Sequence, residues 1–407
     1  MAVCTKPDIA LTDLLSGRFA TIQENLHQYL NSANLVMLRG TSKRLRAEID
    51  KYCNFNIDAR LNVLFKEPKA FRNLQAHCDA IIAGPFASYF FTRASKTHGK
   101  RVIVLIFAEQ HPLLLHEYLQ QEGYSEQAFE MADRLVERYG PRSYVKIGNE
   151  SVQIRTHYHP RHPGVQDFLQ AFVYSTNDMA VITWNKAYHL LPHCTFVKRK
   201  SYLLATPSFS LSKMLRRQAM LGLQICSLHL DQFDYDPPYD LQLLTWPRSI
   251  RDKYTWIMDL DTTGVTPSKT PDYVLESTTF RIRLPRLSEL PRPQFPINHY
   301  RLCNFYILHY PVTRHKYIVD FMPGRRNRPS PSDDPKLTLL ANRLHDFTVI
   351  ELLKMDSSLL PSRANDVIMG LMDARDLEDF VQPPNWNFYD HMVEQRLAEI
   401  HEQRTSW

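Results

Sequence analysis

The sequence is short of glycine and has no closely spaced pair of cysteines. Only 12 of its 407 residues are glycine, a small supply for the loops whose backbone amides cradle phosphate groups. The six cysteines are scattered along the chain, which excludes a zinc ribbon or a Cys-x-x-Cys redox pair. We therefore expect reduced thiols in the folded chain rather than a disulfide framework.

Long hydrophobic runs are absent as well. The most apolar segments, 80–91 and 102–108, fall well short of the ~20 residues that cross a bilayer. The opening residues, MAVCTKPDIALTD, do not follow the basic-then-apolar order of a signal peptide. With 44% apolar and 23% charged residues, the composition is typical of a globular protein. We expect a soluble cytoplasmic or nuclear protein.

The pattern of the first half predicts an α/β fold. A strand at 80–82 leads through Gly84-Pro85 to a helix ending near 93, and 102–108 reads as a buried strand. Further predicted elements are helices at 112–122, from 125 to 139 and around 165–190, and strands at 143–148 and 152–158. Together they predict a small mixed sheet covered by helices.

The flanking segments predict helices at the N-terminus and a strand-plus-helix region at the C-terminus. Apolar residues recur at helical spacing over 10–30, and strand patterns occur at 255–260, 277–284 and 304–310. Further helices are predicted at 337–347, 361–380 and 387–403. We divide the chain into a helical cap (1–66), a core (67–205), a strand-rich extension (206–322), a linker (323–335) and a helical C-terminal region (336–407).

Several segments share a family resemblance. They are LVMLRGTSKRLRAEIDKY (35–52), LFKEPKAFRNLQAHCDAIIAGPFASYFF (64–91), LLLHEYLQQEGY (113–124), NDMAVITWNKAYHLLPHCTFVKRKSYLL (177–204) and, more weakly, NHYRLCNFYI (298–307). The chain resembles uncharacterised filamentous-fungal proteins that have a degenerate nucleotidyltransferase-like core behind an F-box-like N-terminus. The resemblance implies a nucleotidyltransferase-like sheet, with the turn at Gly84 opening its cleft.

An active core of that kind needs carboxylates that this chain lacks. Two metal-binding acids alternate on the strand after the turn, and a third lies on a later strand, because Mg²⁺ prefers hard oxygen ligands. By pattern these positions are Val102, Val104 and Gln153. We therefore expect no catalytic residues and no cofactor. If the cleft serves another chemistry, its residues would be Gly84, Arg101, Gln153, Asn177 and Lys186.

Three other groups of residues suggest chemistry more weakly. Asp259 and Asp261 form an acid pair that the following turn explains better. His157, His159 and His162 are candidate metal ligands without a clear further partner. Basic steps at 198–200, 216–217 and 325–328, with Phe196, Tyr202 and Trp184, resemble a phosphate-binding surface. Their low density favours a solvated face and makes nucleic acid an unlikely partner.

These observations favour a non-catalytic scaffold or interaction protein with an unknown protein partner. One alternative is an F-box-like substrate adaptor of a ubiquitin ligase that binds a Skp1-type adaptor through residues 10–66. In such an adaptor the apolar stripe Leu11, Leu14, Leu15 and Leu26 would be a partner surface, whereas in a helical cap the same stripe would be buried within the chain. The other alternative is an enzyme with a repurposed cleft or residual nucleotidyltransferase activity. We expect Trp184 to lie on a buried helix.

Overall fold

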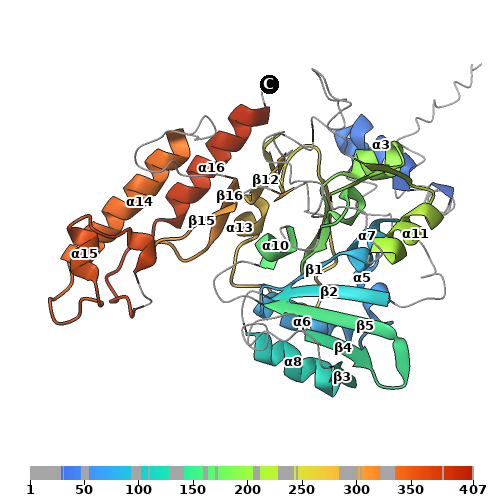
Figure 1. Cartoon of the computed structure of the whole chain (residues 1–407), viewed down its shortest axis with the longest axis horizontal. Helices are drawn as coiled ribbons and strands as arrows, with labels where there is room; N and C mark the ends of the chain where they lie inside the picture. Colours follow the sequence, from blue (N-terminus) through green and yellow to red (C-terminus); the bar gives the residue numbers. More distant parts are fainter. Residues whose placement is uncertain are drawn as a thin grey trace, which may run out of the picture. The chain divides into compact units, whose positions relative to one another are not determined.

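The structure is a computed structural model that divides into two compact units (Figure 1). It describes residues 29–30, 32–46, 55–92, 102–108, 111–127, 142–158, 164–169, 173–204, 211–227, 243, 246–283, 301–302, 305–320, 335–377 and 380–405. Unit 1 is Met1–Gln232, Lys253–Lys269 and Pro291–His299, and unit 2 is Phe233–Asp252, Thr270–Leu290 and Tyr300–Trp407. The segment 206–322, which the sequence suggests is one extension, is thus divided between the units. No helix in the described ranges is long and apolar enough to cross a membrane.

Unit 1 is a mixed α/β structure built on an eight-stranded sheet, larger than the small sheet expected. Its strands are β1 (Ile81–Ala83), β2 (Val102–Ala108), β3 (Tyr124–Gln127), β4 (Arg142–Lys146), β5 (Asn149–Tyr158), β6 (Ala180–Ile182), β7 (Lys186–His189) and β11 (Trp256–Asp259). They are ordered β11-β7-β6-β1-β2-β5-β4-β3. The pair β2–β5 is parallel and the other neighbours are antiparallel. The predicted strands at 80–82, 102–108, 143–148 and 255–260 are confirmed to within two residues, and the strand predicted at 152–158 begins three residues earlier, at Asn149.

The helix predicted around 165–190 is wrong. Among its described residues, Gly164–Asp167 form the short helix α10 and Thr176–Asp178 a single helical turn, whereas residues 180–189 form the hairpin β6–β7, in which Thr183 N donates to Lys186 O at 2.8 Å. Apolar residues spaced for a helix fit a strand equally well over so short a run. The helix predicted from 125 to 139 is also wrong at its start, because 124–127 is strand β3. These two errors account for much of the additional sheet.

Helices cover one face of the sheet and form the main core with it. They are α3 (Ser32–Thr41), α5 (Ile57–Leu61), α6 (Pro68–His77), α7 (Pro85–Thr92) and α8 (Pro112–Gln121). Leu35, Leu61 and Phe71 are buried in one apolar cluster with Val104 and Ile154 of the sheet. The described helices before β1 are therefore core elements of unit 1. The stripe Leu11, Leu14, Leu15 and Leu26 lies outside the described residues.

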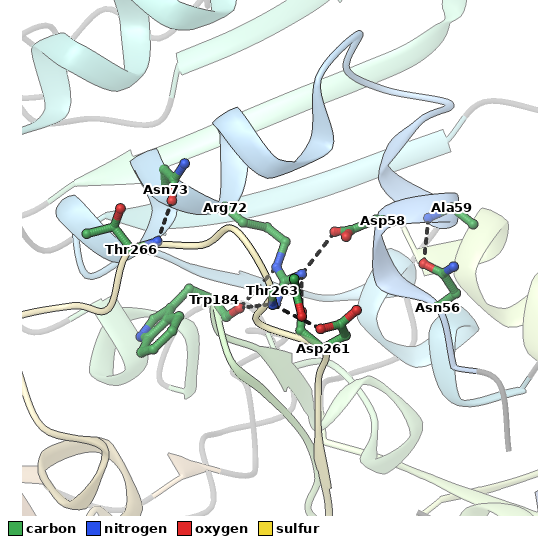
Figure 2. A network of polar contacts seen from close by, with 9 residues as sticks. All are labelled: Asn56, Asp58, Ala59, Arg72, Asn73, Trp184, Asp261, Thr263 and Thr266. Atoms are coloured by element: carbon green, nitrogen blue, oxygen red, sulfur yellow. Dashed lines mark hydrogen bonds and ion pairs between the residues drawn. The ribbon is translucent and has the colours of Figure 1, made fainter. Parts of the chain in front are cut away.

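A buried arginine joins these helices to the sheet (Figure 2). Arg72 of α6 donates through Nη1 to Asp58 Oδ1 at 3.0 Å and to Asp261 O at 2.6 Å. Its Nε and Nη2 donate to Trp184 O at 3.0 and 2.6 Å. Four elements thus meet at one guanidinium: α5, α6, the β6–β7 turn and the chain after β11. The planar fork of arginine suits such a junction because its donors point in fixed directions.

A second, smaller layer of unit 1 is a strand–helix–strand unit. Strands β8 (Lys200–Leu203) and β9 (Gln224–Ser227) are parallel, and α11 (Ser212–Met220) lies between them in sequence. Gly222, at φ +71°, ends α11 in the left-handed conformation that glycine adopts readily. The turn η3 (Thr176–Asp178) contacts β8 through Thr176 Oγ1, which accepts from Tyr202 N at 3.0 Å. The five-residue helix η4 (His193–Val197) precedes β8.

Unit 2 combines short strand pairs with helices. Its strands are β10 (Arg248–Ser249), β12 (Thr279–Phe280), β13 (Ile282–Arg283), β14 (Arg301–Leu302), β15 (Phe305–Leu308) and β16 (Tyr317–Asp320). Its helices are α13 (Asp272–Glu276), α14 (Pro335–Leu353), α15 (Ala364–Ile368), the single turn η8 (Ala374–Asp376) and α16 (Asp390–Thr405). The helix predicted over 361–380 is only five residues long, because Gly370 at φ +68° and the turns around it interrupt the helical path. Most of the predicted linker, 323–334, lies outside the described residues.

Candidate functional site

The turn after β1 requires glycine. Gly84 has φ +71°, and a Cβ atom built there would lie 2.8 Å from Leu105 Cδ1. Such a contact is too short for a real Cβ, and the positive φ disfavours other residues. The Leu105 side chain therefore lies directly against the turn. Ser88 of α7 links the turn to Asn177. Its Oγ lies 3.2 Å from Gly84 O and 2.8 Å from Asn177 O, and can donate to either carbonyl.

Val102, Val104 and Gln153, which the sequence pattern places at the metal-binding positions, do not share one face of the sheet. Val104 pairs with Ile154, and both are fully buried in the helix-covered core. Gln153 pairs with Ile103, so it belongs to the opposite face, because side chains alternate along a strand. On β2 it is Leu105, paired with Ala83 and Arg155, that adjoins the glycine turn. Val102 and Val104 thus lie on the face opposite to that of Gln153, and the residue of β2 beside the turn, Leu105, is apolar as well.

A buried polar cluster lies next to this turn, centred on Asp178. Its Oδ2 accepts from Ser175 Oγ at 2.9 Å and from Gln218 Nε2 at 3.5 Å. Gln218 also donates to Ser175 Oγ at 2.7 Å and accepts from Ser201 Oγ at 2.9 Å. The cluster thereby joins η3, α11 and β8. Asn177, only 4% exposed, has a buried Oδ1 without a hydrogen-bond partner, so this oxygen can accept from a water molecule or a small donor.

Burial dominates the electrostatics of the cluster. It raises the pKa of Asp178 from 3.8 to about 6, although Ser175, Asn177, Arg217 and Gln218 favour the charged form. Burial also raises the pKa of Tyr89; the charge of Arg217 lowers this pKa and the charge of Asp178 raises it. A carboxyl with this pKa can exchange a proton near neutral pH. Its hydrogen bonds are nevertheless made to the protein itself, which is typical of a structural role.

The structure brings together only part of the predicted cleft. Gly84 and Asn177 meet through Ser88, but Asn177 lies in η3 rather than on a helix. Gln153 lies two strands from β1 and donates to Ser143 Oγ at 2.7 Å. Lys186 is remote from Gly84 along the sheet. Ala83 pairs with Val181 near the start of β6, whereas Lys186 follows the turn beyond Ile182, at the other end of the hairpin. Arg101 lies outside the described residues.

The histidine cluster is described only at His157. Its ring stacks on Phe107 with centroids 4.9 Å apart, and burial, followed by the charge of Arg155, lowers its pKa to about 3. His159 and His162 lie outside the described residues. In the part of the chain that the structure describes, no three His, Cys, Asp or Glu residues are grouped as metal ligands would be. His157 therefore acts as a neutral ring packed in the sheet.

The two remaining candidate groups also have structural explanations. Asp261 Oδ1 accepts from Thr263 N at 2.9 Å, which confirms the turn interpretation of the acid pair. Among the aromatic residues considered with the basic steps, Phe196 and Tyr202 are buried and Trp184 lies in the β6–β7 turn. Phe196 and Tyr202 are therefore covered and cannot serve as a stacking platform for bases. The basic step at 325–328 lies outside the described residues.

Sequence reasoning missed Asp178, Ser175 and Gln218. The first two belong to a run of four polar residues, 175–178, between apolar segments, and such a run is a signal for a turn whose side chains bond locally. Gln218 carries no such signal, since its partners come from distant segments. The chain was also compared with protein-family models, curated proteins and solved structures, and none of the three comparisons found a match.

Proposed function

We propose that this protein is a non-catalytic scaffold or interaction protein built on a nucleotidyltransferase-like core without metal-binding carboxylates. The order strand, glycine turn, helix, strand in β1, Gly84, α7 and β2 supports that origin. The proposal rests mainly on Leu105, the residue of β2 that packs against the turn. A leucine offers no ligand to Mg²⁺, and its bulk occupies the position.

The buried polar cluster supports the same conclusion. Asp178, the carboxylate of the cluster beside the Gly84 turn, is held in internal hydrogen bonds by Ser175 and Gln218. Catalytic acids in transfer sites instead hold metal ions between themselves and the phosphate oxygens. The cluster therefore stabilises the fold around the former cleft. What the protein offers to other molecules is then its surface.

A transfer assay tests the absence of catalysis. The full chain is incubated with labelled nucleoside triphosphates, Mg²⁺ or Mn²⁺, and mixed RNA and protein acceptors, beside an active nucleotidyltransferase. We expect no divalent-dependent incorporation above background. Incorporation that is lost in Gln153→Ala or Asn177→Ala, with circular dichroism unchanged, would refute the proposal and favour a repurposed or residual enzyme. The matched control is Gln224→Ala, which changes an exposed residue on β9.

A further inference from the structure

The strand–helix–strand layer of unit 1 carries a surface of one charge sign. From Met179 to Leu230 the sequence contains no Asp or Glu. The same segment contains Lys186, Lys198, Arg199, Lys200, Lys213, Arg216 and Arg217. We call Lys198, Arg199, Lys200, Lys213 and Arg216 the basic surface. Lys200 is half-buried and the other four are exposed.

Helix α11 divides its residues between the interior and this surface. Gln218 points inward to Ser175 and Ser201. Lys213, Arg216 and Met220 follow one another at i, i+3 and i+7, so they share the opposite, outward side of the helix. All three are exposed, and Met220 is 71% exposed. An apolar side chain thus lies in line with two cations on the outer side of α11, which Figure 1 shows at the periphery of unit 1.

The loop before β8 adjoins the end of the same helix. The Arg199 guanidinium donates to Leu221 O, the carbonyl that follows α11, and lies over Gly222. Lys198 and Lys200 flank Arg199 in sequence, and Gln224 N donates to Arg199 O at 2.7 Å. The cations of this loop therefore lie at the C-terminal end of α11, while Lys213 and Arg216 lie along its outer side.

Internal pairing does not explain these charges. Within the described ranges, Lys198, Lys200, Lys213 and Arg216 make no ion pair, whereas the charge of Arg217 favours the ionised form of Asp178. The helix dipole favours a cation in the last turn, as for Arg217, but disfavours one in the first turn. Lys213 lies in that first turn with no acidic neighbour in it. The fold alone gives no reason for this surface.

We propose that the basic surface binds an acidic protein segment that also carries apolar side chains. This inference rests on the proposed function and names the chemistry of the partner. Charge complementarity selects a polyanion, and Met220 selects an apolar contact, since flexible methionines serve adaptable protein-binding surfaces. Single-stranded nucleic acid is bound by cations together with exposed aromatic rings, and the neighbouring aromatic residues Phe196 and Tyr202 are buried.

Fluorescence anisotropy of the full chain tests the proposal. The probe is a labelled synthetic peptide of glutamates interspersed with leucines, and the comparison probes are its glutamine analogue, a glutamate-only peptide, and single- and double-stranded DNA of equal charge. We expect the glutamate–leucine peptide to bind most tightly, and its affinity to fall as salt is raised. Lys213→Glu with Arg216→Glu should weaken it about tenfold or more. Met220→Ser should weaken the glutamate–leucine peptide but not the glutamate-only peptide.

The control variant is Lys43→Glu with Lys66→Glu, which makes the same change of charge at two exposed lysines elsewhere in unit 1. It should leave binding nearly unchanged. The proposal is overturned if no probe responds to the Lys213 and Arg216 changes, or if DNA binds more tightly than the peptide and Met220→Ser has no effect. These results leave the transfer assay unaffected, so failure of this inference is distinguishable from failure of the proposed function.

Discussion

Replacing Arg72 tests whether one guanidinium holds the core of unit 1 together. Its side chain is 1% exposed and donates four hydrogen bonds, two of them to Trp184 O. In Arg72→Leu, two carbonyl oxygens and one carboxylate oxygen lose their donors. An acceptor left without a donor in the interior costs about 1–3 kcal/mol, and less where water can reach it. The leucine recovers part of this through apolar burial, and Asp58, whose side chain is 25% exposed, remains partly solvated, so we expect a net loss of about 3 kcal/mol.

Hydrogen exchange followed by mass spectrometry across a urea series measures this loss in unit 1 alone, through peptides that cover β1 and β6. Arg72→Lys should keep part of the stability, because an ammonium cannot reproduce the planar fork. The control is Arg142→Gln: Arg142 and Glu126 are 3.5 Å apart with both side chains 38% exposed, and such a pair contributes less than about 1 kcal/mol. If the urea midpoint of Arg72→Leu matched that of the control, the role assigned to Arg72 would be refuted.

The remaining predictions concern three single side chains of unit 1. The pKa of Asp178 is raised from 3.8 to about 6 in the folded chain, so between these pH values the folded state binds more protons than the unfolded state, and stability falls as pH rises. Asp178→Asn should remove this decline. If the free energy of unfolding of the variant and that of the parent ran parallel from pH 4 to pH 7, the prediction would be wrong. Trp256→Ala should cost about 3–5 kcal/mol, since Trp256 is fully buried among Phe55, Phe91 and Phe196. Trp184→Ala should cost about 1 kcal/mol, because Trp184 bonds to Arg72 through its carbonyl; equal urea midpoints for the two variants would count against this assignment.

The sequence by itself determined the elements with a strong local signal. The glycine turn at Gly84 and the buried strand 102–108 were predictable because a positive φ favours glycine and a continuous apolar run of that length fits a fully buried strand. The turn at Asp261 was predictable in the same way, from an Asp that bonds the backbone two residues on. The lack of a carboxylate beside the glycine turn also follows from sequence, since every candidate residue on that strand is apolar.

Only the tertiary structure decided which residues share a face and which polar groups meet. Whether Val104 or Leu105 adjoins Gly84 depends on strand register, and a shift of one residue reverses every side chain. Residues 180–189 form a hairpin because β1 and β11 supply neighbours for both strands, which a local pattern does not contain. Arg72 and Asp178 find partners from segments up to 189 residues away. Such partners are fixed by packing and are invisible to periodicity, and for that reason the buried networks emerged only from the folded chain.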